Sequence, residues 1–293
     1  MRWPLDRPVP CAFLFVPGNS LEKLYKSWQL GAGALIFDLE DSVPEFQKLQ
    51  ARKNVSLALK TAPERATPAF VRINDGSSAH WQEDISATID KNLTGFFLPK
   101  CESPEQLSAA ADIIEASEKN AGMVPGSISL VALIESARGL VEIPQIIDAA
   151  DRLAGLALGG EDFCLNMGIS RTAEGQELQY ARSHLAIWAR AKGCLAIDTI
   201  YANFHDSLGL MRESQLAKQL GFTGKLAIHP KQLDVIRDVF APSEEELAEA
   251  KKVVEAFAAA QVKGSAVIAV DGKMIDRPVF ERARRLLASA QRR

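Results

Sequence analysis

The sequence predicts an α/β fold, a (β/α)8 TIM barrel with a C-terminal helical extension. Eight short apolar runs alternate with longer amphipathic stretches along the chain. Most of these runs are continuously apolar, as in strands that are buried on both faces of a parallel sheet. Eight such units fit within about 230 residues, close to the usual barrel size of about 250. The count of eight therefore favours a closed barrel over a doubly wound open sheet.

The predicted strands are, in chain order, Cys11–Val16, Ala34–Leu39, Ala69–Ile73, Gly95–Leu98, Ser129–Ile134, Gly155–Leu158, Cys194–Ile197 and Lys225–Ile228. Helical patterns between them include Leu21–Leu30, Pro104–Lys119, Gln179–Lys192 and Ser207–Leu220. Asn19 and Ser20 are good helix-capping residues, and Pro104 directly follows Ser103, which is typical of a helix start. No segment between these units resembles a linker, so residues 1–240 are predicted to form one catalytic barrel domain.

The chain continues beyond the eighth unit. A charged helix over Ser243–Gln261 is followed by VIAVDGKMIDRPV and by a basic helix that ends at Arg293. Residues 241–293 exceed what a barrel needs and are predicted to be a helical extension of the same domain unit. Two roles are open for it: it covers the barrel bottom, or it reaches a neighbouring subunit.

Composition excludes several classes of protein. The 293 residues contain 47% hydrophobic residues, enough for a large core, and 34 Lys and Arg balance 37 Asp and Glu. This near-neutral balance argues against a general nucleic-acid binder and against disorder. No apolar run approaches the roughly 18 residues that would span a bilayer. The first ten residues do not resemble a secretory signal, so a cytoplasmic protein with no membrane partner is expected.

Cysteine and histidine do not indicate a zinc site. The cysteines form no CxxC pair and are predicted to be reduced thiols packed as small hydrophobes: Cys11, Cys101, Cys164 and Cys194. The four histidines are scattered, and His229 is expected to be a satisfied residue at the barrel rim. A site for a hard metal ion, built from carboxylates, remains open.

Charged residues follow nearly every predicted strand. In a parallel barrel the active site lies at the carboxyl ends of the strands, so this pattern is informative. Glu135 emerges directly from the apolar run SLVALI, and Asp162 follows GLALGG, whose glycines allow a ligand close to the backbone. These two carboxylates are predicted to bind Mg²⁺, which usually takes one or two protein carboxylates together with water and substrate oxygens. Asp38 has a simpler alternative, since it can cap a helix or pair with a lysine.

Nine segments, taken together and in this order, resemble the citrate lyase beta-subunit/malyl-CoA lyase family. They are FLFVPGN (13–19), LIFDLEDSV (35–43), VRIN (71–74), LPK (98–100), LIESARG (133–139), LALGGEDF (156–163), AIDTIY (196–201), LGFTGKLAIHP (220–230) and DGKMIDRPV (271–279). The resemblance implies a (β/α)8 barrel that is typically trimeric and requires Mg²⁺. It also implies cleavage or formation of the C–C bond of 3-hydroxyacyl thioesters.

The resemblance assigns catalytic roles to particular residues. Glu135 and Asp162 match the metal ligands of the family. Arg72 matches the arginine that binds substrate and stabilises the enolate. Glu40 and Asp41 match an acidic pair below the metal.

Further roles come from the same comparison of motifs. Asp276 matches the acid/base on a C-terminal segment that closes over the site of a neighbouring subunit. Phe15 and Lys26 match contacts to the CoA nucleotide. Lys100, Gly160 and Glu161 fall in motifs that bind substrate, and a Schiff-base role for Lys100 is redundant beside a metal.

One departure concerns the thioester carrier. Many relatives have Arg-Ser before LFVPG and an arginine after PGN, whereas this chain has Cys11-Ala12 and Ser20.

The expected function is therefore a Mg²⁺-dependent lyase that cleaves citramalyl-CoA or malyl-CoA to acetyl-CoA and a 2-oxoacid. One alternative is the citryl-acyl-carrier-protein lyase subunit of a citrate lyase complex, which needs acyl carrier protein as partner. A third hypothesis, of another class, is a binding or regulatory barrel without turnover. Discrimination between a methyl group and a hydrogen on the 2-oxoacid amounts to only about 1–3 kcal/mol. The order of residues in the sequence therefore does not identify the substrate.

Overall fold

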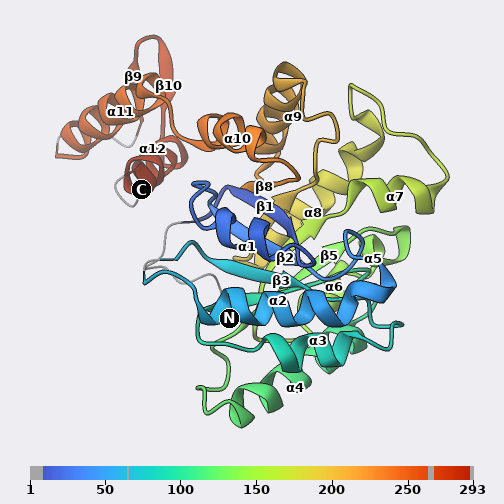
Figure 1. Ribbon diagram of the computed structural model, residues 1–293. Coiled ribbons are helices and arrows are strands. Elements are labelled where there is room, and N and C mark those ends of the chain that lie inside the picture. Colours follow the sequence, from blue (N-terminus) through green and yellow to red (C-terminus); the bar gives the residue numbers. More distant parts are fainter. Residues whose placement is uncertain (1–8, 65, 263–266, 291–293) are drawn as a thin grey trace. The chain divides into compact units, whose positions relative to one another are not determined.

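A computed structural model describes residues 9–64, 66–262 and 267–290 of the chain (Figure 1). The chain divides into two compact units, with the boundary between Phe240 and Ala241. The first unit contains a closed barrel of eight parallel strands, and the predicted TIM barrel is confirmed. The second unit is a smaller helical assembly.

The strands follow one another around the barrel in chain order, and each neighbouring pair is parallel. They are β1 (Ala12–Pro17), β2 (Ala34–Asp38), β3 (Ala69–Arg72), β4 (Leu93–Leu98), β5 (Ser129–Ile134), β6 (Leu153–Leu158), β7 (Leu195–Asp198) and β8 (Gly224–Ala227). Every predicted run overlaps one of these strands. In β4 and β6 the strand begins two residues before the predicted Gly95 and Gly155, and the register shifts just ahead of each glycine. Both glycines lie inside the barrel wall rather than at a strand end.

Helices and short 3₁₀ turns occupy the outside of the barrel. They are α1 (Leu21–Ser27), η1 (Glu45–Gln47), α2 (Lys48–Lys60), α3 (Trp81–Thr88), α4 (Pro104–Asn120), α5 (Ala137–Val141), α6 (Ile143–Ile146), α7 (Gly160–Met167), η2 (Gln176–Leu178), α8 (Gln179–Lys192), α9 (Ser207–Leu220), η3 (Pro230–Gln232) and α10 (Leu233–Phe240). Local chemistry sets several ends: Ser103 and Gln106 form a capping box before α4. Helix α1 ends at Ser27, before the predicted Leu30, because Leu30 N bonds back to Ser27 O in a tight final turn.

Two apolar layers hold the barrel unit together. Side chains that point inward fill the barrel, and among them the rings of Phe13, Phe70 and Phe97 meet at centroid distances of 5.4–6.3 Å. Outward-facing strand residues and the inner faces of the helices form a second, larger cluster. Because successive strand residues point to opposite faces, each strand contributes to both layers and its apolar run is continuous.

The second unit contains α11 (Glu244–Val262), the antiparallel strands β9 (Ile268–Val270) and β10 (Lys273–Ile275), and α12 (Arg277–Ala290). Its own apolar core includes Val253, Ile275 and a stacked pair of rings, Phe257 and Phe280, 4.8 Å apart. The two predicted helices are present, and the segment between them forms a hairpin that the sequence did not predict. The end of the last predicted helix, residues 291–293, lies outside the described residues. Coverage of a neighbouring subunit's site stays a prediction.

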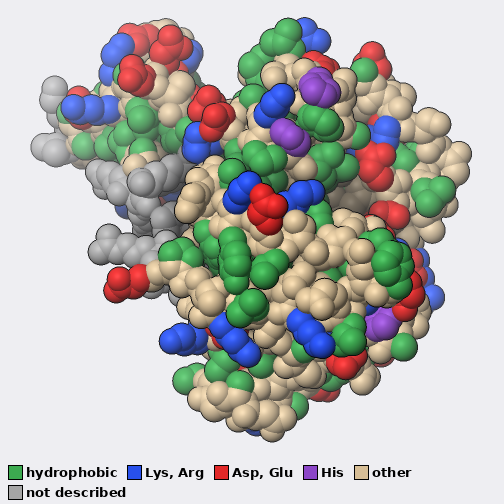
Figure 2. All heavy atoms as spheres, viewed as in Figure 1, with side chains coloured by type: hydrophobic (Ala, Val, Ile, Leu, Met, Phe, Trp, Pro, Cys, Tyr) green, Lys and Arg blue, Asp and Glu red, His purple; other side chains and the backbone are tan. Residues whose placement is uncertain are grey.

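The surface carries mixed charge (Figure 2) and the cysteines are free thiols, as the sequence predicts. On the face shown in Figure 2, basic and acidic side chains lie interspersed over the barrel unit. No helix in the described part of the chain is long and apolar enough to cross a membrane. All four cysteines are free thiols, and three of them are buried. The expected cytoplasmic location stays a prediction.

Gly95 provides a test of how tightly the barrel wall is packed. A Cβ at this position would lie 2.5 Å from Ser129 O on the neighbouring strand, so backbone would have to move. We expect Gly95→Ala to lower the free energy of unfolding by about 1–3 kcal/mol, the usual cost of overpacking. Gly76→Ala is the control, since its Cβ would meet its nearest atom at 4.0 Å. Equal urea midpoints for both variants would contradict this account.

Candidate active site

The candidate site is the top inward-facing layer of the barrel. Phe13, Ile36, Phe70, Leu133 and Ile197 belong to the barrel interior. Two residues further along each strand, the same face carries Phe15, Asp38, Arg72, Glu135 and Thr199, which all line one cavity of about 400 Å³. The period of two in a strand thus converts the apolar core into a polar floor at the carboxyl ends of the strands.

A bidentate ion pair between β2 and β3 anchors this floor. The strand register places Asp38 beside Arg72, and Arg72 Nε and Nη2 donate to the two Asp38 oxygens at 2.7 and 2.8 Å. Backbone N–H groups of Glu40 and Ser42 donate to the same carboxylate at 3.0 Å. Burial opposes ionisation of Asp38, but Arg72 outweighs it and lowers the pKa of Asp38. Asp38 therefore caps a turn and pairs with an arginine, not with a lysine.

The predicted acidic pair meets the other side of Arg72. Arg72 Nη1 lies 2.9 Å from Glu40 Oε2 and donates to Asp41 Oδ2 at 3.1 Å. Glu40 is buried, and its Oε2 accepts no hydrogen bond within the described part of the chain. Burial raises the pKa of Glu40 to about 7, although Arg72 and Lys100 oppose the shift.

Lys100 connects two buried carboxylates. Its Nζ donates to Glu40 Oε1 at 3.1 Å, and its backbone N–H donates to Glu135 Oε1 at 2.6 Å. The backbone of Lys100 adopts φ 47°, a left-handed conformation that is uncommon for a residue with a side chain. The predicted substrate-binding lysine therefore also shapes the acidic floor.

Glu135 is a buried carboxylate with little compensation for its charge. It has 4% of its surface exposed and lies at the end of β5. Burial, followed by the charge of Glu40, raises the pKa of Glu135 to about 8. Gly159 leaves the room that this side chain occupies, since a Cβ there would lie 2.6 Å from Glu135 Cβ. Few groups compensate the charge of this carboxylate: the backbone N–H of Lys100 donates to it, while the charges of Glu40 and Asp162 oppose its ionisation.

Glu135 and Asp162 lie where two cavities adjoin. Both residues line the cavity of Phe15 and Arg72, and both also line a second cavity of about 410 Å³ that contains Lys100 and Asp75. The charge of Asp162 contributes to the raised pKa of Glu135, as expected for neighbouring carboxylates. The structure therefore brings together Arg72, Glu135 and Asp162 at one end of the barrel.

The donor set fits a hard divalent cation. Acidic side chains outnumber basic ones among the residues that line the two cavities. Within residues 9–64, 66–262 and 267–290, no three His, Cys, Asp or Glu side chains are grouped to hold a metal ion by themselves. Two carboxylates that leave the remaining positions to water and substrate are the usual protein share for Mg²⁺. A cation here would also offset the excess negative charge.

The first turn of α7 carries Asp162 and two further predicted residues. Gly160 N donates to Thr199 Oγ1 at 2.9 Å, and a Cβ at Gly160 would lie 2.7 Å from that same oxygen. Glu161 lines the Arg72 cavity and accepts a hydrogen bond from Arg171 at 3.0 Å. Glycine at position 160 thus leaves room for the side chain of Thr199, which directly follows β7.

The remaining predicted residues have different surroundings. Phe15 lies under the Arg72 guanidinium, 4.8 Å from ring centroid to Cζ. Lys26 is an exposed residue of α1, pairs with Glu22 at 2.6 Å and lines neither of the two cavities. Asp276 belongs to the second unit, where its Oδ1 accepts from Val279 N at the start of α12. His229 accepts from Lys231 N and stacks on Phe204, which confirms the expected rim histidine.

Sequence reasoning missed three participants in the site. Lys48 is buried, and its Nζ donates to the carbonyl groups of Leu39 and Glu40 at 2.8 and 2.7 Å. Thr199 holds Gly160, and Arg171 holds Glu161. The position of Thr199, two residues after an inward Ile197, could have revealed it. No motif marks Lys48 or Arg171, because their contacts depend on how the loops after β2 and α7 fold and, for Glu213, on a residue 42 positions away.

Comparison with known proteins agrees with this geometry. The model of the HpcH/HpaI aldolase/citrate lyase family matches residues 12–230, which span the whole barrel from β1 to the end of β8. The chain belongs to this family. The predicted resemblance is confirmed, and so is the prediction of a lyase, since the named relatives are lyases of this family.

Two relatives and one solved structure illustrate the family. The chain is 39% identical to the citrate lyase subunit beta of Leuconostoc mesenteroides subsp. cremoris, covering 94% of this chain and 92% of the relative. It is 31% identical to the mitochondrial citramalyl-CoA lyase of Homo sapiens, covering 95% and 85%. The crystal structure of the Mycobacterium tuberculosis protein CitE with magnesium, acetoacetate and coenzyme A is similar with a TM-score of 0.81 and 33% identity, covering 98% of this chain and all (100%) of that chain.

The pKa of Glu135 predicts how stability depends on pH. The folded protein keeps this proton up to about pH 8, whereas the ordinary value is 4.5. The folded state then binds more protons than the unfolded chain between these values, so the free energy of unfolding falls as pH rises across the window. We expect Glu135→Gln to reduce this decline. Urea unfolding in EDTA from pH 5 to pH 8 measures it, and parallel curves for both proteins would contradict the assignment.

Proposed function

We propose that this protein is a Mg²⁺-dependent carbon–carbon lyase that cleaves a 3-hydroxyacyl-CoA thioester, citramalyl-CoA or malyl-CoA, to acetyl-CoA and a 2-oxoacid. The observation that carries the proposal is the meeting of Arg72 with Glu135 and Asp162 around one cavity. The Arg72 guanidinium can stabilise negative charge that develops on one substrate oxygen. The carboxylates of Glu135 and Asp162 can hold a metal ion that polarises a second oxygen.

Glu135 and Asp162 would hold the metal ion. When bound, Mg²⁺ supplies a Lewis acid for the carboxylate and hydroxyl oxygens of the substrate. The relative from Mycobacterium tuberculosis was crystallised with magnesium, which supports the same ion here. The raised pKa of Glu135 means that a proton must leave this carboxyl before it binds a cation, so cation affinity should rise with pH up to about 8.

Arg72 would stabilise the enolate of the departing acyl thioester. A guanidinium has five N–H donors. Three hydrogen bonds go from Arg72 to Asp38 and Asp41, and Nη1 also lies 2.9 Å from Glu40 Oε2. The second N–H of Nη2 is then the donor that remains for an oxygen in the cavity. Burial opposes the charge of Arg72, but the carboxylates of Asp38, Glu40 and Asp41 outweigh burial, raise the pKa of Arg72 and keep it charged. Asp38 holds the guanidinium in place before substrate arrives, so no reorganisation is needed when charge develops.

Asp276 is proposed as the acid/base, contributed by a neighbouring subunit of a homotrimer or higher oligomer. In cleavage it would protonate the enolate carbon, and in condensation it would remove a methyl proton. Its side chain is half-buried and accepts one backbone hydrogen bond at 3.2 Å. Among the described residues no hydrogen bond reaches its other oxygen, Oδ2, which we assign to proton transfer.

A second candidate is the citryl-acyl-carrier-protein lyase subunit of a citrate lyase complex. The 39% identity to a citrate lyase beta subunit supports it. Ser20, where many relatives are expected to carry an arginine, accepts from Lys23 N as the N-cap of α1 and supplies no cation for a nucleotide phosphate. The two carriers differ in what they present to the same cavity, so one assay can separate them.

The test is a cleavage assay with a panel of thioesters. Citramalyl-CoA, malyl-CoA and citryl-acyl-carrier protein are each supplied with Mg²⁺ or with EDTA, and release of the acyl product is measured. Cleavage of a CoA thioester that EDTA abolishes supports the first proposal. Cleavage of the protein-bound thioester alone replaces it with the second candidate. Turnover of none of them contradicts both.

Variants of Arg72 and Asp276 are both expected to slow the chemical step. Arg72→Lys keeps the charge but loses the paired geometry toward Asp38, and kcat should fall about 100-fold, as for loss of one oxyanion donor.

Asp276→Asn should abolish proton transfer while Mg²⁺ affinity stays unchanged. Full cleavage activity of Asp276→Asn would show that another group is the acid/base.

A further inference from the structure

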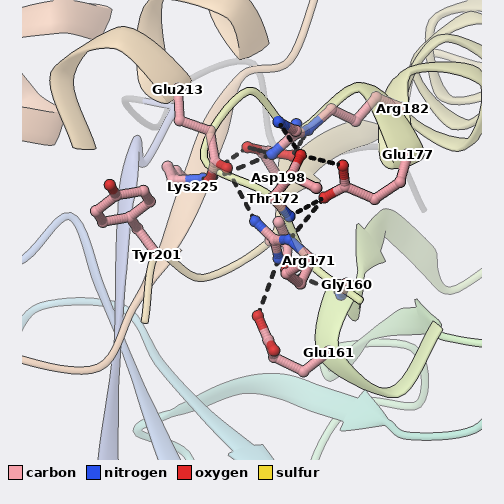
Figure 3. Close-up of polar contacts among 12 residues, drawn as sticks. Gly160, Glu161, Arg171, Thr172, Glu177, Arg182, Asp198, Tyr201, Glu213 and Lys225 are labelled. Carbon is pink, nitrogen blue, oxygen red and sulfur yellow. Dashed lines mark hydrogen bonds and ion pairs between the residues drawn. The ribbon is translucent and has the colours of Figure 1, made fainter. Parts of the chain in front are cut away.

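We propose that Arg171 is a positioning residue that fixes the first turn of α7, and with it Asp162, for binding the divalent cation. This inference rests on the proposed function, because it assigns the metal to Asp162. Arg171 lies on the connection between α7 and η2 and points toward residues of three different segments (Figure 3).

Arg171 makes three ion pairs. Its Nη1 bonds to Glu161 at 3.0 Å, its Nη2 bonds to Glu213 at 2.9 Å, and its Nε lies 3.3 Å from Glu177. Glu161 is the neighbour of Asp162 and its side chain is 49% exposed, whereas Glu213 is 7% exposed. Arg171 thus joins a residue at the cavity to a residue inside the protein.

The inner end of this link is a rigid, charge-balanced network. Lys225 on β8 and Arg182 on α8 both pair with Asp198 at the end of β7 and with Glu213 on α9 (Figure 3). The side chains of Arg182, Asp198 and Lys225 are fully buried, at 0% exposure. Each charge is paired, and breaking a buried pair is costly, so this network resists displacement.

Two ties connect the network to the turn that precedes Asp162. Thr199, which directly follows Asp198, accepts from Gly160 N at 2.9 Å. Arg171 holds Glu161 and lies so close to Gly160 that a Cβ there would be 2.9 Å from Nη1. Gly160 is therefore held by Thr199 and Glu161 by Arg171, and Asp162 is the next residue of the helix. Groups behind a metal ligand commonly change affinity about 10–100-fold when they are removed.

Direct binding of Mn²⁺, measured by electron paramagnetic resonance without substrate, tests this role. Arg171→Gln should raise the Mn²⁺ Kd about 10-fold. Simple electrostatics predicts the opposite sign, since loss of a positive charge near a cation site tightens binding. The sign of the change therefore separates positioning from charge. Arg171→Lys keeps the positive charge beside the acids, and its Mn²⁺ Kd should lie between those of the unmodified protein and Arg171→Gln.

A matched pair of variants tests the same link without touching the buried network. Glu161→Gln and Glu161→Ala lose the same charge, but the glutamine keeps an oxygen that accepts from Arg171. Glu161→Ala should weaken Mn²⁺ binding more than Glu161→Gln does. Arg152→Gln is the control for stability, because Arg152 pairs with the buried Glu118 beside the residue that precedes β5, at the opposite end of the strands. It should lower Tm and leave the Kd unchanged.

The outcomes are distinct. A lower Tm with an unchanged or tighter Mn²⁺ Kd in Arg171→Gln would show that Arg171 only stabilises the fold. Equal Kd values for the two Glu161 variants would also overturn the inference. If Asp162→Asn binds Mn²⁺ as the unmodified protein does, the metal site of the proposed function is wrong, and this result does not depend on Arg171.

Discussion

The bidentate pair of Asp38 and Arg72 is the constraint on which the site depends. It joins the ends of two neighbouring strands at 2.7 and 2.8 Å, and both side chains continue the inward face of the barrel. Because Asp38 uses both oxygens on the guanidinium, Arg72 is oriented before any ligand binds. Glu40 and Asp41 then contact Nη1 of the same guanidinium, so four side chains form one group around Arg72.

A second consequence is an excess of negative charge around the cavities. Burial beside other carboxylates raises the pKa of Glu40 to about 7 and of Glu135 to about 8, so the folded chain stores unfavourable electrostatic energy when both are ionised. A divalent cation would relieve it. The charged network of Arg182, Asp198 and Lys225 shows the contrast, since there each buried charge has an opposite partner. Excess negative charge thus characterises the candidate active site, whereas the buried network beside it is neutral.

Local pattern predicted the barrel and the carboxylate pair of Glu135 and Asp162, whereas the roles of Arg72, Glu40 and Asp41 were implied by the resemblance to a family. Continuous apolar runs identified the strands, and acids placed just after them fell at one rim. Two of the differences between prediction and structure show the physical causes. Gly95 lies within β4, not at its start. A glycine is found inside this strand because the backbone of Ser129 would lie 2.5 Å from a Cβ at this position. The hairpin of β9 and β10 was missed since its strands have three residues each.

The sequence by itself determined the eight strands and the carboxylates Glu135 and Asp162 that follow two of them, because these depend on the length of apolar runs and on residue type. Only the tertiary structure decided which charges meet. The partner of Asp38 is 34 residues away, and Glu161 and Glu213 reach Arg171 from opposite directions in the chain. Such pairs depend on strand register and helix packing, which no local pattern encodes.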